Sequence, residues 1–163
     1  MLRTLSLMTF VILLLHQAQA QGKRHIIPRD SITDKYTYQG VSDTISADKE
    51  QLRGRLEKWI KQNYNPEERQ YASSKQDGDS YTMHDREALP GKARKYVEYD
   101  LTVDIKDKRY RYKLTHLEYI AVGKYPLEDK MATDKRSDLE EIHTICSRIV
   151  ESLDAAMKKG DDW

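Results

Sequence analysis

A strict alternation of apolar and polar side chains runs through residues 97–114, and it constrains the fold more than any other pattern in the chain. The apolar members are odd-numbered in the first half and even-numbered in the second: Val97, Tyr99, Leu101, Val103 and Ile105, then Tyr110, Tyr112 and Leu114. A period of two predicts two half-buried strands, and the change of parity fits a hairpin with a tight turn centred on Asp107 and Lys108. That register pairs Asp104 with Arg111, because a slip of one residue would turn the apolar side chains toward solvent.

Two other segments have the periodicity of amphipathic helices. The first covers residues 47–64, and Ser46 in front of it is a natural N-cap. The second begins with the capping box Ser137-Asp138-Leu139-Glu140 and runs to Lys159, with Gly160 closing it. Its apolar stripe consists of Leu139, Ile142, Ile145, Cys146, Ile149, Val150, Leu153 and Met157. Each helix is apolar on one side only, so each is expected to cover part of a sheet.

Shorter strands complete the expected fold. The turn Asp77-Gly78-Asp79 predicts a hairpin between residues 67–76 and 80–87, and its thin apolar content places that hairpin near a sheet edge. Tyr36, Tyr38 and Val41 predict an early strand, and residues 122–131 are expected to form a connector. The order strand, helix, four strands, helix predicts an α+β two-layer sandwich. Both helices should lie on one face of the antiparallel sheet and leave the other face open.

The amino terminus has the pattern of an export signal. Residues 1–20 contain one cation, Arg3, then an apolar run from Leu5 to Leu15 that is too short to span a membrane, then Ala18-Gln19-Ala20. We expect cleavage before Gln21 and a secreted or periplasmic product with no transmembrane segment. Residues 21–34 are expected to be a flexible N-terminal segment, and residues 35–160 a single domain.

Composition bears on the kind of partner. The chain has 28 basic and 27 acidic side chains, and removal of the signal would leave them equal in number. A balanced charge argues against nucleic acid as a partner, since such binders rely on a basic excess. Cys146 is the only cysteine, so no intramolecular disulfide is possible. Its place on the second helical stripe predicts a buried, inert thiol.

Two phrases resemble a known family of small secreted bacterial domains of unknown function with a TATA-binding-protein-like (TBP-like) fold. The first is Lys58-Trp59-Ile60, which ends the early helix. The second is Ile105-Lys106-Asp107-Lys108-Arg109-Tyr110-Arg111-Tyr112, similar to that family's "KDGRYR" strand-turn-strand signature, with Lys108 where glycine is usual. The resemblance covers residues 36–119 and implies the element order given above. It implies no activity.

The candidate site is the open sheet face, where Asp100, Asp104, Arg111 and Lys113 are expected to lie together. We interpret this face as the surface of a noncatalytic binding module for an unknown protein or glycan of the cell envelope. No residue set has the spacing of a known catalytic or metal site, so we expect no catalytic residues, metal or cofactor.

Two alternatives remain open. The first is a small envelope hydrolase or transferase that uses His84 or His116 with a nearby carboxylate. Strict alternation, however, would place His116 on the apolar face opposite Tyr99, and a pocket where histidine and carboxylate converge would be needed. The second is a structural envelope protein that associates through a sheet edge lacking charged residues.

Overall fold

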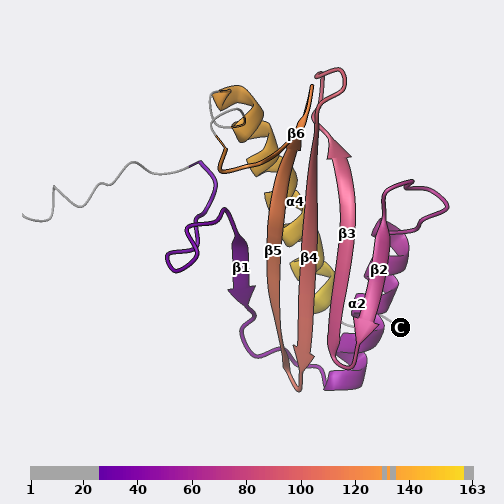
Figure 1. The fold of residues 1–163 in the computed structure, drawn as a ribbon. Coiled ribbons are helices and arrows are strands. Elements are labelled where there is room, and N and C mark those ends of the chain that lie inside the picture. Colours follow the sequence, from indigo (N-terminus) through magenta and orange to yellow (C-terminus); the bar gives the residue numbers. More distant parts are fainter. Residues whose placement is uncertain (1–25, 130–131, 133–134, 160–163) are drawn as a thin grey trace, which may run out of the picture.

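The computed structural model describes residues 26–129, 132 and 135–159, and it has the predicted α+β architecture (Figure 1). The signal sequence predicted for residues 1–20 and the closing residue Gly160 lie outside the described residues. In chain order the elements are β1 (Tyr38–Val41), α2 (Lys49–Asn63), β2 (Ser73–Asp77), β3 (Ser80–Ala88), β4 (Tyr96–Lys106), β5 (Arg109–Ile120), β6 (Lys124–Pro126) and α4 (Arg136–Lys158).

The sheet is antiparallel, with the strand order β1-β5-β4-β3-β2, and β6 pairs with β5. The register of the β4–β5 hairpin agrees with the prediction, since Asp104 lies opposite Arg111 and Leu101 opposite Leu114. The Asp-Gly hairpin is also present, and it places β2 at one edge of the sheet. The strand β6 lies in the segment that was predicted to be a connector. Its three residues are too few to show a period in the sequence.

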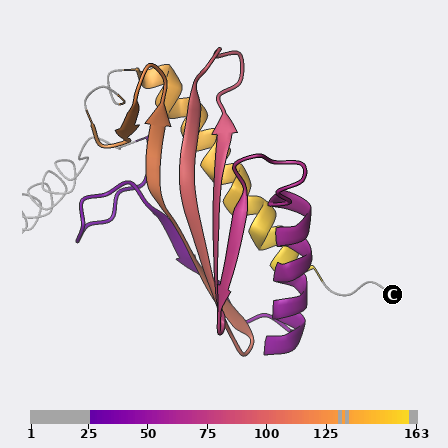
Figure 2. The same ribbon diagram turned by 45° about the vertical axis from the view of Figure 1, so that its right-hand side comes forward.

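Both helices pack on one face of the sheet, and no described helix covers the opposite face, which we call the bare face (Figures 1 and 2). The predicted apolar stripe of α4 is buried except for Val150, which is partly buried, and Ile142, Cys146 and Leu153 are fully excluded from solvent. The odd-numbered side chains of β4 lie against the helices, and Leu101 and Val103 are fully buried. Cys146 is therefore a buried thiol, as predicted, and burial raises its pKa to about 12.

Both predicted helix caps were wrong. The N-cap of α2 is Asp48, which forms a reciprocal capping box with Gln51, so the helix begins two residues after the position predicted from Ser46. The helix α4 begins at Arg136 without a side-chain cap, and Ser137 lies inside its first turn. The carboxylate of Glu140, the other half of the predicted box, instead accepts a hydrogen bond of 3.0 Å from Arg136.

Tyrosine hydroxyls join the sheet to the helices. Tyr110 on β5 donates to Asp154 on α4, and Tyr81 on β3 donates to Glu57 on α2. Because the rings are buried and the hydroxyls find partners, tyrosine suits a layer interface with a thin core. Within the described part of the chain, no helix is long and apolar enough to cross a membrane.

Candidate functional site

The four residues predicted to form the site lie on the bare face of the sheet, but they do not form one cluster. Arg111 Nε lies 2.6 Å from Asp104 Oδ2, and this contact helps to hold the Asp104 pKa below its usual value although burial acts to raise it. Lys113 lies opposite Thr102 and makes no ion pair with any described residue. Asp100 lies further along β4 and is held by two histidines.

A single carboxylate links both histidines of the sheet face. Nδ1 of His84 lies 2.7 Å from Asp100 Oδ1, and Nδ1 of His116 lies 2.8 Å from Asp100 Oδ2. Each imidazole is therefore oriented by a hydrogen bond at its own Nδ1 atom. The sequence pattern treated each histidine alone, because the pairing of β3, β4 and β5 that brings them together is not a local signal.

The expected position of His116 on the apolar face was wrong. A β-bulge interrupts the β4–β5 pairing, so that His116 and Leu117 together oppose Tyr99. His116 has a φ of 51°, a left-handed conformation that glycine usually occupies in bulges of this kind. The extra residue turns the imidazole onto the bare face and Leu117 into the core, where it is buried.

The bulge lies at a gap in the outer edge of β5. Both β1 and β6 pair with this edge, but β1 reaches only Leu114 and β6 begins at Glu118. Residues 115–117 therefore lie between the two strands, and Leu127 N donates to Leu117 O beside the gap. The strain at His116 marks this place as a candidate functional site, because unfavourable backbone conformations persist where the surroundings or the function require them.

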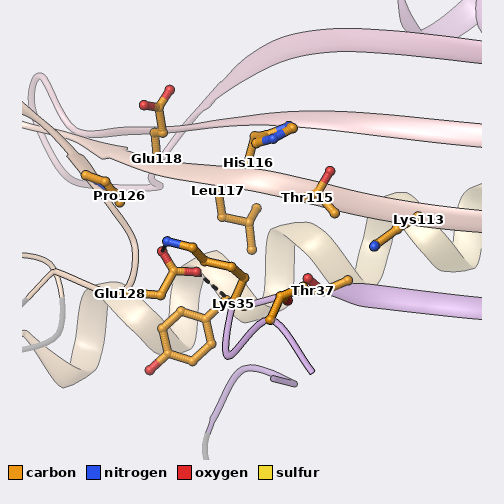
Figure 3. A pocket seen from close by; sticks show the side chains of 11 residues that line it. Lys35, Thr37, Lys113, Thr115, His116, Leu117, Glu118, Pro126 and Glu128 are labelled. Atoms are coloured by element: carbon orange, nitrogen blue, oxygen red, sulfur yellow. Dashed lines mark hydrogen bonds and ion pairs between the residues drawn. The ribbon is translucent and has the colours of Figure 1, made fainter. Parts of the chain in front are cut away.

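A cavity of about 390 Å³ lies at this gap, and we call it the edge groove. One wall is β5 from Lys113 to Glu118, and the facing wall is the segment 33–37 together with Pro126 and Glu128. In Figure 3, Leu117 points toward Lys35 and Glu128, whereas His116 and Glu118 point to the other side of the strand. The groove was not predicted, because it depends on the bulge and on the end of β1.

The acidic groups of the edge groove already have partners. Glu118 pairs with Lys124 at 2.6 Å, and Glu128 accepts a hydrogen bond of 2.7 Å from the backbone of Tyr36. Lys35 lies farther from Glu128, at 3.8 Å, and its side chain is 63% exposed. The groove lining therefore has two lysines and two glutamates, and Lys113 is the member of this set without an ion-pair partner among the described residues.

A second network on the bare face consists of charged side chains that are already paired with one another. Glu98 on β4 is nearly buried and accepts from Arg86 at 2.8 Å and Lys124 at 2.5 Å. Burial acts to raise the Glu98 pKa, but these two cations outweigh it and lower the pKa below its usual value. The guanidinium of Arg86 also lies 4.0 Å from the ring centre of Tyr71, so this end of the face is rigid and paired.

The two histidines of this face have a carboxylate partner but no nucleophilic partner among the described residues. Among the residues that the structure describes, no serine, threonine or cysteine side chain hydrogen-bonds His84 or His116, and no three His, Cys, Asp or Glu side chains are placed to hold a metal ion. Cys146 is buried under the other face and its raised pKa keeps it protonated.

The fold and the two-helix layer define a TBP-like α+β domain. Residues 38–120 match the family model described as "Domain of unknown function (DUF4468) with TBP-like fold", and the chain belongs to this family. The matched range contains β1 through β5, and therefore the bulge at His116 and the residues predicted to form the site. The comparison with curated proteins found no match.

Two solved structures from Bacteroidetes are similar in fold. A TBP-like protein from Parabacteroides distasonis ATCC 8503 has a TM-score of 0.64 and 14% sequence identity, over 83% of this chain and 100% of that one. A DUF4468 family protein from Bacteroides ovatus ATCC 8483 has a TM-score of 0.65 and 13% identity, over 86% of this chain and 95% of that one. At these identities the likeness concerns the fold.

Proposed function

We propose that this protein is an exported, noncatalytic binding module whose bare sheet face recognises a protein or glycan of the cell envelope. The observation that carries the proposal is the placement of His116. A strained bulge turns this side chain onto the bare face, where it is 79% exposed beside a groove. A residue that costs backbone energy and contributes no core packing is best explained by a role in recognition.

The charges of the face support the same proposal. Asp104 and Arg111 form an ion pair in which the arginine side chain is 71% exposed, so the pair is reachable by a partner. Such a pair adds little to stability, but complementary charges on a partner give specificity and speed association. Lys113, another residue of the predicted set, lies two residues beyond Arg111 on β5 and lines the edge groove.

A partner exchange experiment tests the proposal. The double substitution Asp104→Arg with Arg111→Asp reverses the exposed pair, and we expect it to abolish capture of a partner from the envelope fraction. The matched control reverses Arg136 and Glu140, an exposed ion pair on α4 at 3.0 Å. Equal capture by both variants would contradict a recognition role for the sheet face.

One observation favours a second candidate, the small envelope hydrolase or transferase. Asp100 orients His116 through Nδ1 at the rim of a cavity, an arrangement in which the other ring nitrogen can act as a general base. The missing element is a nucleophile held by that imidazole. Turnover of ester, amide or glycoside substrates that disappears in both Asp100→Asn and His116→Gly would favour the enzyme over the binding module.

Association through a sheet edge has weaker support. The edge strand β2 is exposed along its whole length, but it carries Lys75 and Asp77, charges of the kind that oppose edge-to-edge pairing.

Export follows from the amino-terminal pattern and has its own test. The mature protein is expected outside the cytoplasm with Gln21 as its first residue, and mass spectrometry of the amino terminus measures this. An intact Met1 on the exported protein would contradict cleavage.

A further inference from the structure

We propose that the edge groove binds the carboxylate-bearing sugar unit, a uronic acid, of an acidic glycan. This inference rests on the proposed function and names the ligand class of the same face. It combines three properties of the groove: its size, its uncommitted positive charge, and its mixture of hydroxyl groups with apolar surface.

The size suits a single ring better than an extended chain. A volume of about 390 Å³ is at the lower end of the range of about 300–1,000 Å³ found for small-molecule sites. A peptide that added to the edge of β5 would need free strand length, yet only residues 115–117 lie between β1 and β6. Three residues span about 10 Å, which is too short for a stable added strand.

The charge suits a carboxylate. Lys113 has no ion-pair partner in the described part of the chain, and Lys35 is only loosely placed against Glu128 at 3.8 Å. Glu118 pairs with Lys124 and Glu128 accepts from the Tyr36 backbone, and neither acid forms an ion pair with Lys113. An incoming carboxylate therefore gains a charge-assisted contact without displacing an existing one.

The remaining lining suits a sugar ring. Of the groove lining, Thr115 is partly exposed and Pro126 is exposed, whereas Thr37 and Leu117 are almost fully buried. Hydroxyl groups match the polar edge of a sugar, and apolar surface matches its C–H face. His116 lies at the rim of the groove, on the other side of β5 from Leu117, and its hydrogen bond to Asp100 fixes the imidazole before a ligand arrives.

Calorimetric titration of the mature chain tests the inference. The probe is trigalacturonate, its matched control ligand is the fully methyl-esterified trisaccharide, and a tri-glutamate peptide represents the acidic-peptide alternative. We expect saturable binding of trigalacturonate and at least about tenfold weaker binding of the other two. No binding of trigalacturonate, equal binding of the ester, or equal binding of the peptide would each overturn the inference.

Two groove variants and one control locate the site. Lys113→Gln should weaken trigalacturonate binding about tenfold or more, and His116→Gly, which accepts the positive φ, should weaken it at least about threefold. Lys75→Gln removes an exposed lysine on β2 at the far edge and should change nothing. An equal loss in Lys75→Gln, or no loss in the groove variants, would overturn the inference.

The two proposals fail separately. If trigalacturonate does not bind while envelope capture still depends on Asp104 and Arg111, the uronic-acid inference is wrong and the binding module stands. If trigalacturonate binds in the groove but envelope capture is unchanged by reversal of Asp104 and Arg111, the uronic-acid inference is supported. Recognition of a partner by the Asp104–Arg111 pair is then wrong.

Discussion

The two faces of the sheet are formed by the same strands but differ in the burial and the contacts of their side chains. On the covered face, side chains such as Leu101 and Leu114 are fully buried and pack under the helices. On the bare face, the neighbouring Asp104 and Arg111 are held by an ion pair and stay in contact with solvent. Burial of apolar surface is the main source of stability, so the covered face should dominate folding and the bare face is available for recognition.

Two carboxylates show the same contrast. Asp138 is 1% exposed and accepts hydrogen bonds from Lys95 at 2.6 Å and Tyr119 at 2.7 Å. Asp100 is 30% exposed and is bonded to two histidines that face solvent. Asp138 is enclosed, and its hydrogen bonds link α4 to β5 and to the loop before β4. Asp100 remains accessible to a ligand.

The largest effect is expected on the covered face. Ile149→Asp places a charge among the apolar side chains between α4 and the sheet, and should lower the free energy of unfolding by more than about 3 kcal/mol. Urea denaturation measures the change. The exposed Thr144→Asp on the same helix is the control and should stay within about 0.5 kcal/mol of the unsubstituted protein. Equal stability of the two variants would show that this face does not dominate folding.

A smaller loss is expected when the enclosed carboxylate is removed. Burial acts to raise the pKa of Asp138, but hydrogen bonds from Lys95, Tyr119 and Lys92 outweigh it and lower the pKa to about 2. Because the folded pKa lies below the unfolded value of 3.8, the stabilisation is complete above about pH 4 and is lost as the pH falls through 2. Asp138→Asn should therefore cost about 2 kcal/mol at pH 7.

Denaturation at pH 7 and at pH 2 measures this prediction. The difference between Asp138→Asn and the unsubstituted protein should shrink at the lower pH. Glu151→Gln, an exposed carboxylate on α4, is the control and should change stability little. A difference for Asp138→Asn that stays constant with pH would contradict the role of its charge.

Reversal of the exposed pair should change stability less than Ile149→Asp or Asp138→Asn does. Asp104→Arg with Arg111→Asp keeps opposite charges in the same cross-strand positions, so the free energy of unfolding should change by less than about 1 kcal/mol. A loss of several kcal/mol would mean that the bare face also carries folding energy, and the distinction between the two faces would then be wrong.

The sequence predicted the fold because its strongest signals are periodic. Alternation around the turn at Asp107 and Lys108 determined the β4–β5 register, and the stripe from Leu139 to Met157 marked the buried side of α4. The cap of α2 was mispredicted because several residues near its start can act as a cap, whereas α4 has no side-chain cap among the described residues. Asp48 was favoured over Ser46 by its reciprocal contact with Gln51.

The candidate site was predicted only in part. Asp104 and Arg111 form the expected pair. The cluster of His84, Asp100 and His116 and the edge groove depend on a β-bulge, which strict alternation does not predict. A signal was present: the apolar positions are even-numbered up to Leu114 and odd-numbered at Leu117 and Tyr119, which requires an extra residue between them. The end of β1 and the placement of β6, which complete the groove, have no such signal.

The central claim is that His116 is kept at a strained position for recognition and not for stability. The most direct test is the free energy of unfolding of His116→Gly, with His116→Ala as the variant that removes the imidazole but keeps the strain. Glycine relieves a left-handed conformation worth about 1–2 kcal/mol, which offsets its entropy cost and the loss of an exposed hydrogen bond. We predict that His116→Gly is as stable as the unsubstituted protein to within about 1 kcal/mol, and more stable than His116→Ala. A loss of more than about 2 kcal/mol in His116→Gly would contradict the account, since the imidazole would then be retained for its bond to Asp100.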